Sequence, residues 1–252
     1  MLEYSIILIV TALAGGLAAY KLPRQQGQLY RLVLVFAGAY LFAITVTHLL
    51  PEILQGSKEP HHVGLLVLAG FFLQLLLEYL TAGVEHGHVH PPGDTGGNHH
   101  HYHGALTPLS LLLALCLHAF LEGTLLLHPV GEGVAHQTNS LLAGIVLHKA
   151  PAAFALVSVL LAHMKSRYWP VVMLACFALA SPLGLWFSEL MQEGNGSLGS
   201  LTRWIYPLVA GSFLHISTTI FFENSPDHRF NFRKLVVSLL GAGLGAMVEI
   251  IA

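Results

Sequence analysis

Eight long apolar stretches, separated by short polar segments, make up most of the chain. Each is close to the ~20 residues that an α-helix needs to cross a lipid bilayer. The stretches cover residues 4–20, 29–53, 63–84, 106–128, 140–163, 169–191, 201–222 and 235–252. The pattern predicts an all-α polytopic membrane protein whose eight transmembrane helices form one domain over residues 1–252.

The composition supports this prediction. Of the 252 residues, 54% are hydrophobic and 10% are charged, and the mean hydropathy of +0.66 is too high for an ordinary soluble domain. The net charge of -2 gives no reason to expect a nucleic-acid partner. Cys116 and Cys176 lie in apolar runs and are interpreted as small buried side chains. No organic cofactor is expected, and a homodimer is left open.

The distribution of Lys and Arg predicts the orientation, because cytoplasmic loops are enriched in these residues. With the N-terminus outside, eight of them fall in cytoplasmic loops and two fall in outer loops. The eight are Lys21, Arg24, Arg31, Lys165, Arg167, Arg229, Arg233 and Lys234, and the two are Lys58 and Arg203. Both termini are therefore predicted to lie outside. The first stretch has no basic residues before it and is expected to be a retained helix.

The predicted cytoplasmic loop at residues 85–104 is rich in histidine. Its seven histidines are His86, His88, His90, His99, His100, His101 and His103. Neutral imidazole binds zinc, copper and nickel, so this tract suits weak capture of a transition metal. The alternative interpretation is a solvated polar linker whose histidines have no specific role.

Ionisable side chains inside apolar runs are costly, and they indicate function. His118 and Glu122 are four residues apart, so they share one face of a helix and are suited to holding one divalent cation. His148 and Lys149 precede Pro151, which is expected to kink the next helix. The sequence therefore predicts a buried metal site formed by His118, Glu122 and His148.

Other polar residues in the apolar stretches suggest the ends of a pathway. His48 and Glu52 form a second pair of this spacing near the predicted outer boundary, where an entrance role fits. His215 and Glu223 are candidates for the cytoplasmic exit, although His215 could be a core residue and Glu223 a helix cap. Gln74 and Glu78 are interpreted as partners in hydrogen bonds between helices.

Several of these motifs, in this order, resemble the ZIP family of metal transporters. The resemblance rests on the eight stretches, the His48-Leu49-Leu50-Pro51-Glu52 motif, the histidine-rich loop and His118 with Glu122-Gly123. It continues with His148 and Pro151, and with the segment Ala210-Gly211-Ser212-Phe213-Leu214-His215-Ile216. It implies that the fourth and fifth helices line a transport pathway, often with two adjacent metals.

The chain departs from the commonest pattern of that family at positions that often hold further ligands. Those positions carry Ala119, Lys149, Ala152 and Ala153. The run from His148 to Phe154 is instead similar to the branch named after the ninth animal member. That branch also has Ala after the first histidine, but it has Asp where this chain has Glu122.

Lys149 is expected to limit the site to one metal. At about 5 Å and an effective dielectric near 20, an ammonium repels each unit of positive charge by roughly 3 kcal/mol. Lys149 is therefore interpreted as a substitute for the second cation that pairs with Glu122 and exchanges a proton as metal passes. The alternative is that its ammonium extends to the membrane interface.

These observations predict a carrier that moves a divalent transition metal, with Zn²⁺ favoured, toward the cytoplasm. Its expected partners are metal ions and the lipid bilayer, in a bacterial inner membrane or an animal-type plasma or Golgi membrane. An enzyme is not expected, although an intramembrane zinc-dependent hydrolase and a metal-sensing receptor of the same fold stay open as alternatives.

Overall fold

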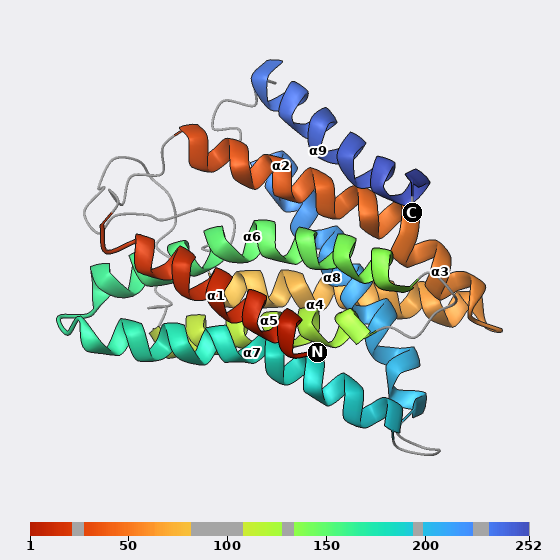
Figure 1. Ribbon diagram of the computed structural model, residues 1–252, viewed down its shortest axis with the longest axis horizontal. Helices are drawn as coiled ribbons and strands as arrows, with labels where there is room; N and C mark the ends of the chain where they lie inside the picture. Colours follow the sequence, from red (N-terminus) through yellow and green to blue (C-terminus); the bar gives the residue numbers. More distant parts are fainter. Residues whose placement is uncertain (22–27, 82–107, 128–133, 194–198, 224–231, 252) are drawn as a thin grey trace.

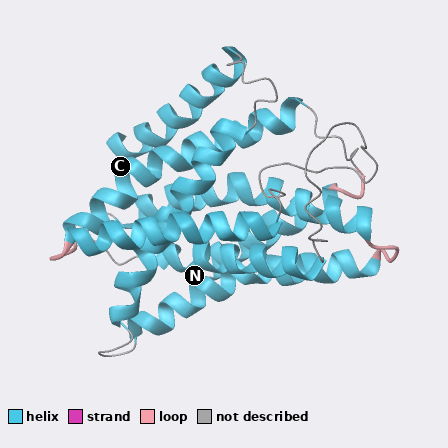
Figure 2. Cartoon of the chain, turned by 180° about the vertical axis from the view of Figure 1, so that it is seen from behind, coloured by secondary structure: helices cyan, strands magenta, loops and turns pink. Residues whose placement is uncertain are grey.

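The computed structural model describes residues 1–21, 28–81, 108–127, 134–193, 199–223 and 232–251, and these residues are almost entirely helical (Figures 1 and 2). The helices are α1 (Leu2–Ala18), α2 (Gln28–Ile44), α3 (Leu50–Gln55), α4 (Pro60–Thr81), α5 (Pro108–Thr124), α6 (Val134–His163), α7 (Tyr168–Glu193), α8 (Gly199–Glu223) and α9 (Phe232–Ile251). A π-helical turn (Thr45–Leu49) joins α2 to α3, and a 3-10 turn (Leu125–Leu127) follows α5. The all-α fold predicted from the apolar stretches is confirmed.

Among the described residues, four helices are long and apolar enough to cross a membrane. They are Gln28–Gln55, Pro60–Leu80, Thr138–His163 and Tyr168–Met191, while α1 and α5 are shorter apolar helices. The side of α4 that faces away from the protein is apolar, with Leu65, Leu68, Phe72 and Leu76 exposed. Such a face suits contact with lipid. The number of spans and the orientation of the termini stay predictions.

Four helix pairs have the most extensive contacts: α1 with α6, α2 with α9, α4 with α8, and α5 with α7. Figure 1 shows α9 beside α2 at one edge of the bundle and α7 at the opposite edge. Contacts of α1 with α7 and of α2 with α8 join the pairs into two larger groups. The buried side chains form two apolar clusters, one around Leu41 and Phe213 and the other around Leu156 and Phe177, and α6 contributes to both.

Helix α6 runs without a break through Pro151 and is held against α2 by two tyrosines. The hydroxyl of Tyr30 donates to the carbonyl of Pro151 at 3.2 Å, and that of Tyr40 donates to the carbonyl of Ser140 at 3.1 Å. These hydrogen bonds fix α6 at two positions that lie on either side of His148. The predicted kink at Pro151 stays a prediction.

Glycines allow α5 and α7 to approach each other backbone to backbone. A Cβ at Gly184 would lie 1.9 Å from the carbonyl oxygen of Phe120, and one at Gly123 would lie 2.0 Å from that of Ser181. Small residues at such contacts are typical of membrane helices, whose association depends on close packing.

We expect Gly184→Ala to lower the free energy of unfolding by about 1–3 kcal/mol, because the new methyl group would force α5 and α7 apart. Thermal unfolding of the purified protein in detergent would measure the loss. Gly64→Ala is the matched control, since a Cβ at Gly64 meets nothing within 4 Å. Equal stability of the two variants would contradict the assigned packing.

Candidate metal site

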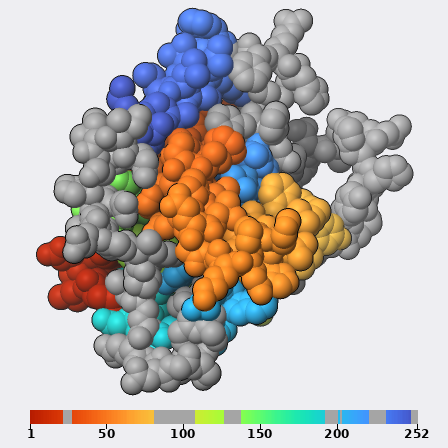
Figure 3. Space-filling view, turned by 90° about the vertical axis from the view of Figure 1, so that its right-hand side faces the viewer, coloured from red at the N-terminus to blue at the C-terminus, as the bar shows by residue number. Residues whose placement is uncertain are grey.

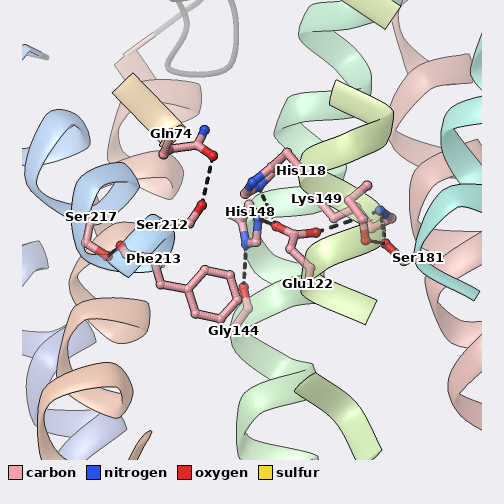
Figure 4. Close-up of polar contacts among 11 residues, drawn as sticks. Gln74, His118, Glu122, Gly144, His148, Lys149, Ser181, Ser212, Phe213 and Ser217 are labelled. Carbon is pink, nitrogen blue, oxygen red and sulfur yellow. Dashed lines mark hydrogen bonds and ion pairs between the residues drawn. The ribbon is translucent and has the colours of Figure 1, made fainter. Parts of the chain in front are cut away.

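Three buried side chains meet between α5 and α6: His118, Glu122 and His148 (Figure 4). His118 and Glu122 point the same way because four residues make slightly more than one helical turn. Glu122 Oε1 lies 2.6 Å from His118 Nε2 and also contacts His148 Nε2. One possible ligand atom from each residue lies within 4.8 Å of the others. The structure thus places three sequence-predicted residues together, and their role as ligands stays a prediction.

The surroundings fix the orientation of the His148 ring. Its Nδ1 lies 3.0 Å from the carbonyl oxygen of Gly144, one turn earlier in α6. Because a carbonyl only accepts hydrogen bonds, Nδ1 carries a hydrogen, and Nε2 is the nitrogen directed at the Glu122 carboxylate. In the neutral imidazole, Nε2 would offer its lone pair to a metal held beside that carboxylate.

The three residues are shielded from solvent. The exposed fraction is 5% for His118, 1% for Glu122 and 6% for His148. The ring of Phe213, on α8, lies 6.5 Å from the His148 ring between centroids and adds an apolar wall. Electrostatic interactions are stronger at such a buried position than in water.

Lys149 occupies the other side of Glu122. Its Nζ lies 4.0 Å from Glu122 Oε2, donates to Ser181 Oγ at 2.7 Å, and lies 4.4 Å from the centroid of the Phe177 ring. Lys149 is only 1% exposed, so the alternative in which its ammonium reaches the membrane interface is wrong. The expected pairing with Glu122 is confirmed as a contact.

Ser181 holds this arrangement from α7, and the sequence did not single it out as a site residue. Its hydroxyl accepts from Lys149 and donates to the carbonyl oxygen of Ala119 at 2.7 Å (Figure 4). The only sequence signal was a serine before a proline, Pro182, in an apolar run. Phe177 likewise looked like any other apolar residue of its helix.

The predicted entrance pair lies near the C-terminal end of the continuous helix formed by α2, the π-helical turn and α3. His48 Nε2 and Glu52 Oε2 are 3.3 Å apart and both side chains are mostly buried. His48 belongs to the π-helical turn, a feature that often marks functional positions. Figure 3 shows the orange part of the chain, which includes α3 and the start of α4, at the surface of this end. The entrance role itself stays a prediction.

His215 does not join the metal cluster. It is buried between α8 and α4, where its Nε2 lies 2.5 Å from Glu78 Oε2. Nearby, the Ser212 hydroxyl donates to Gln74 Oε1 at 2.8 Å. The predicted hydrogen bonds of Gln74 and Glu78 between helices are confirmed, and an exit role for His215 stays a prediction.

Glu223 is the last residue of α8, and its side chain lies outside the described residues. The histidine-rich loop predicted at residues 85–104 lies outside them as well. The proposed roles of these residues at the exit and in metal capture therefore stay predictions.

Comparison with known proteins identifies the family. The family model described as ZIP Zinc transporter matches residues 85–249, which include His118, Glu122, His148 and Lys149. Zinc transporter ZIP1 of Danio rerio is 24% identical over 220 residues, which cover 72% of this chain and 72% of that protein.

Two further relatives belong to the branch suggested by the sequence of the fifth stretch. Zinc transporter ZIP9 of Micropogonias undulatus is 28% identical over 170 residues, or 65% of this chain and 52% of the relative. Zinc transporter ZIP9-B of Xenopus laevis is 27% identical over 161 residues, or 62% and 50%. The chain thus spans about half the length of these ZIP9 proteins. Because the family model matches more than half of the chain, this integral membrane protein belongs to the ZIP zinc transporter family.

Proposed function

We propose that this protein carries a divalent transition metal, with Zn²⁺ as the favoured substrate, across a membrane toward the cytoplasm. The observation that carries the proposal is the buried cluster of His118, Glu122 and His148. Two imidazole nitrogens and one carboxylate oxygen are donors that zinc prefers. The names of the related ZIP1 and ZIP9 proteins also favour zinc.

Three protein ligands suit a transported ion better than a permanently bound one. A structural zinc site is closed by four protein ligands, whereas three leave a position for water or for an incoming ligand. The cluster draws its ligands from two different helices, α5 and α6. Movement of one helix relative to the other would therefore change the number of ligands and release the ion.

A single metal at this site follows from the charge of Lys149. Its ammonium lies 4.0 Å from Glu122 Oε2, on the side where a second metal would share the carboxylate. At about 5 Å and an effective dielectric near 20, it opposes each unit of added positive charge by roughly 3 kcal/mol. Ala119, Ala152 and Ala153 provide no further side-chain ligands.

We further propose that His48 and Glu52 collect the ion outside and that the loop histidines and Glu223 receive it inside. The distribution of Lys and Arg supports this direction. Similarity to zinc transporters of animals favours a plasma or Golgi membrane. We also propose that the protein forms a homodimer.

The two alternatives are less well supported. A hydrolase would need a carboxylate to activate the zinc-bound water, but Glu122 is already engaged as a ligand candidate. The family match also favours transport over hydrolysis. A metal-sensing receptor would use the same buried cluster, so only a flux measurement separates it from a carrier.

We expect liposomes containing the purified protein to take up Zn²⁺ at a saturable rate well above that of protein-free liposomes. A zinc-sensitive dye enclosed in the liposomes would record the flux, and Mn²⁺, Fe²⁺ and Cd²⁺ would be compared as competitors. Binding of Zn²⁺ without any flux would contradict a carrier and favour the receptor.

A further inference from the structure

Positively charged side chains gather where α2 and α9 begin, at one edge of the bundle. Arg31 is the fourth residue of α2, and Arg233 and Lys234 are the second and third residues of α9. Arg31 and Arg233 are exposed, and Lys234 is half-buried. Three cations are thus present at one end of this helix pair.

The packing of α2 against α9 fixes how the two helices are aligned. A Cβ at Gly241 would lie 2.5 Å from the carbonyl oxygen of Phe36, and one at Gly245 would lie 2.9 Å from that of Tyr40. Both helices advance by four residues between these two contacts, so they run in the same direction, as Figure 1 also shows. The beginnings of α2 and α9 therefore lie side by side.

This alignment brings Arg31 close to Lys234. Arg31 precedes Phe36 by five residues, and Lys234 precedes Gly241 by seven residues. With a rise of about 1.5 Å per residue, their levels along the helix pair differ by only about 3 Å. Burial, followed by the positive charge of Arg31, lowers the pKa of Lys234, which precedes the apolar stretch at residues 235–252. The two cations repel each other, and an anion placed beside them would be attracted to both.

Exposed apolar side chains adjoin these cations. Leu29 and Phe232 are each 75% exposed. Phe232, Leu235 and Leu239 follow one another at spacings of three and four residues, so they share one face of α9, and all three are exposed. A small inorganic anion would gain nothing from this face, whereas the acyl chains of a lipid can pack against it.

The combination of charge and apolar surface fits a phospholipid of the surrounding bilayer. Clusters of Lys and Arg beside a membrane-embedded helix attract anionic headgroups. A zwitterionic headgroup carries a positive group of its own, so a headgroup with a net negative charge complements the three cations better. Arg233 and Lys234 also interact with other residues of the chain, and the headgroup would be an additional partner for them.

We propose that the cations at the start of α2 and α9 bind the headgroup of an anionic phospholipid, whose acyl chains lie against the exposed apolar face of α9. This site lies at the α2–α9 edge of the bundle, apart from the metal cluster between α5 and α6. Binding of the lipid does not depend on the proposed transport of metal.

The experiment titrates the purified protein in a neutral detergent with phosphatidylglycerol and counts the bound lipid by native mass spectrometry. Phosphatidylcholine and inorganic phosphate are the comparison probes. The wild type should bind phosphatidylglycerol more tightly than phosphatidylcholine, and inorganic phosphate should not displace it. The double variant Arg31→Gln with Lys234→Gln should bind it about 30-fold more weakly, since each cation near a membrane surface contributes about 1 kcal/mol and 1.4 kcal/mol is a factor of ten.

Two control variants separate a defined site from a general effect of charge. Arg31→Lys with Lys234→Arg keeps both charges and should bind phosphatidylglycerol like the wild type. Lys165→Gln with Arg167→Gln removes two cations between α6 and α7, away from the α2–α9 edge, and should also bind like the wild type. Equal losses of affinity in the two neutralised variants would overturn the proposal. Phosphatidylcholine bound as tightly as phosphatidylglycerol, or displacement of the lipid by inorganic phosphate, would overturn it as well.

Discussion

Replacement of Glu122 by Gln is expected to reduce Zn²⁺ uptake to the level of protein-free liposomes. Its Oε1 contacts both imidazoles, so the amide would remove the only negative charge and the central ligand of the cluster. Neutral amides are poor zinc ligands. We expect zinc affinity to fall at least about 100-fold, more than the loss of a residue that only supports a ligand. Isothermal titration with Zn²⁺ and uptake assays would measure both effects.

Two further variants, one at Glu59 and one at Glu122 itself, serve as controls. Glu59 forms a contact of the same kind with His62, but both side chains are exposed, so Glu59→Gln should transport normally. Glu122→Asp keeps the charge and should retain part of the activity, since a carboxylate stays on the same face of α5. If Glu122→Gln binds zinc as tightly as the wild type does, this cluster is not the transport site.

Much of the fold was predictable because a bilayer imposes a simple rule on sequence. Apolar stretches must be helical when no water is present to satisfy the backbone, so stretches such as 63–84 and 140–163 mark α4 and α6 closely. The π-helical turn at Thr45–Leu49 was not predicted. It lies inside one continuous apolar run, and its local sequence differs little from that of an ordinary helix.

The metal cluster was predictable in part. Helical periodicity alone placed His118 beside Glu122, since both belong to one helix. His148 was included because it is another ionisable residue in an apolar run, next to Pro151, and the resemblance to the ZIP family supported it; no local rule relates residues 26 positions apart. The structure supplies this contact through the packing of α5 and α6.

Partners that come from distant helices were beyond the reach of the sequence. Ser181 is 32 positions from Lys149, and Glu78 is 137 positions from His215. Each helix could have turned another face to its neighbours without any change in its apolar pattern. The glycines at positions 70, 123, 184 and 211 help to select the faces by which α4 packs on α8 and α5 packs on α7, since the backbones come into contact there.

Replacement of Lys149 by Met is expected to make zinc bind more tightly and pass more slowly. Methionine fills a similar volume, but it removes an ammonium that is buried 4.0 Å from Glu122 Oε2. For the two charges of Zn²⁺ the repulsion of roughly 3 kcal/mol per unit charge amounts to about 6 kcal/mol, so its loss should raise affinity by up to about 10,000-fold, since each 1.4 kcal/mol is a factor of ten. Tighter binding slows release, so the maximal rate of uptake should fall. Titration of the binding site and uptake at saturating Zn²⁺ would separate the two effects.

Two control variants test whether the change in zinc affinity comes from the charge of Lys149. Ser181→Ala removes the hydroxyl that accepts from the ammonium but keeps the charge, so it should alter affinity much less than Lys149→Met. Lys58→Met, at an exposed position, should change nothing. Metal selectivity and the pH dependence of uptake should shift in Lys149→Met alone, because only there is the charge beside Glu122 lost. If the affinity, selectivity and pH dependence of Lys149→Met all match those of the wild type, Lys149 does not act as the second cation. The restriction to one metal must then come from the missing ligands at Ala119, Ala152 and Ala153.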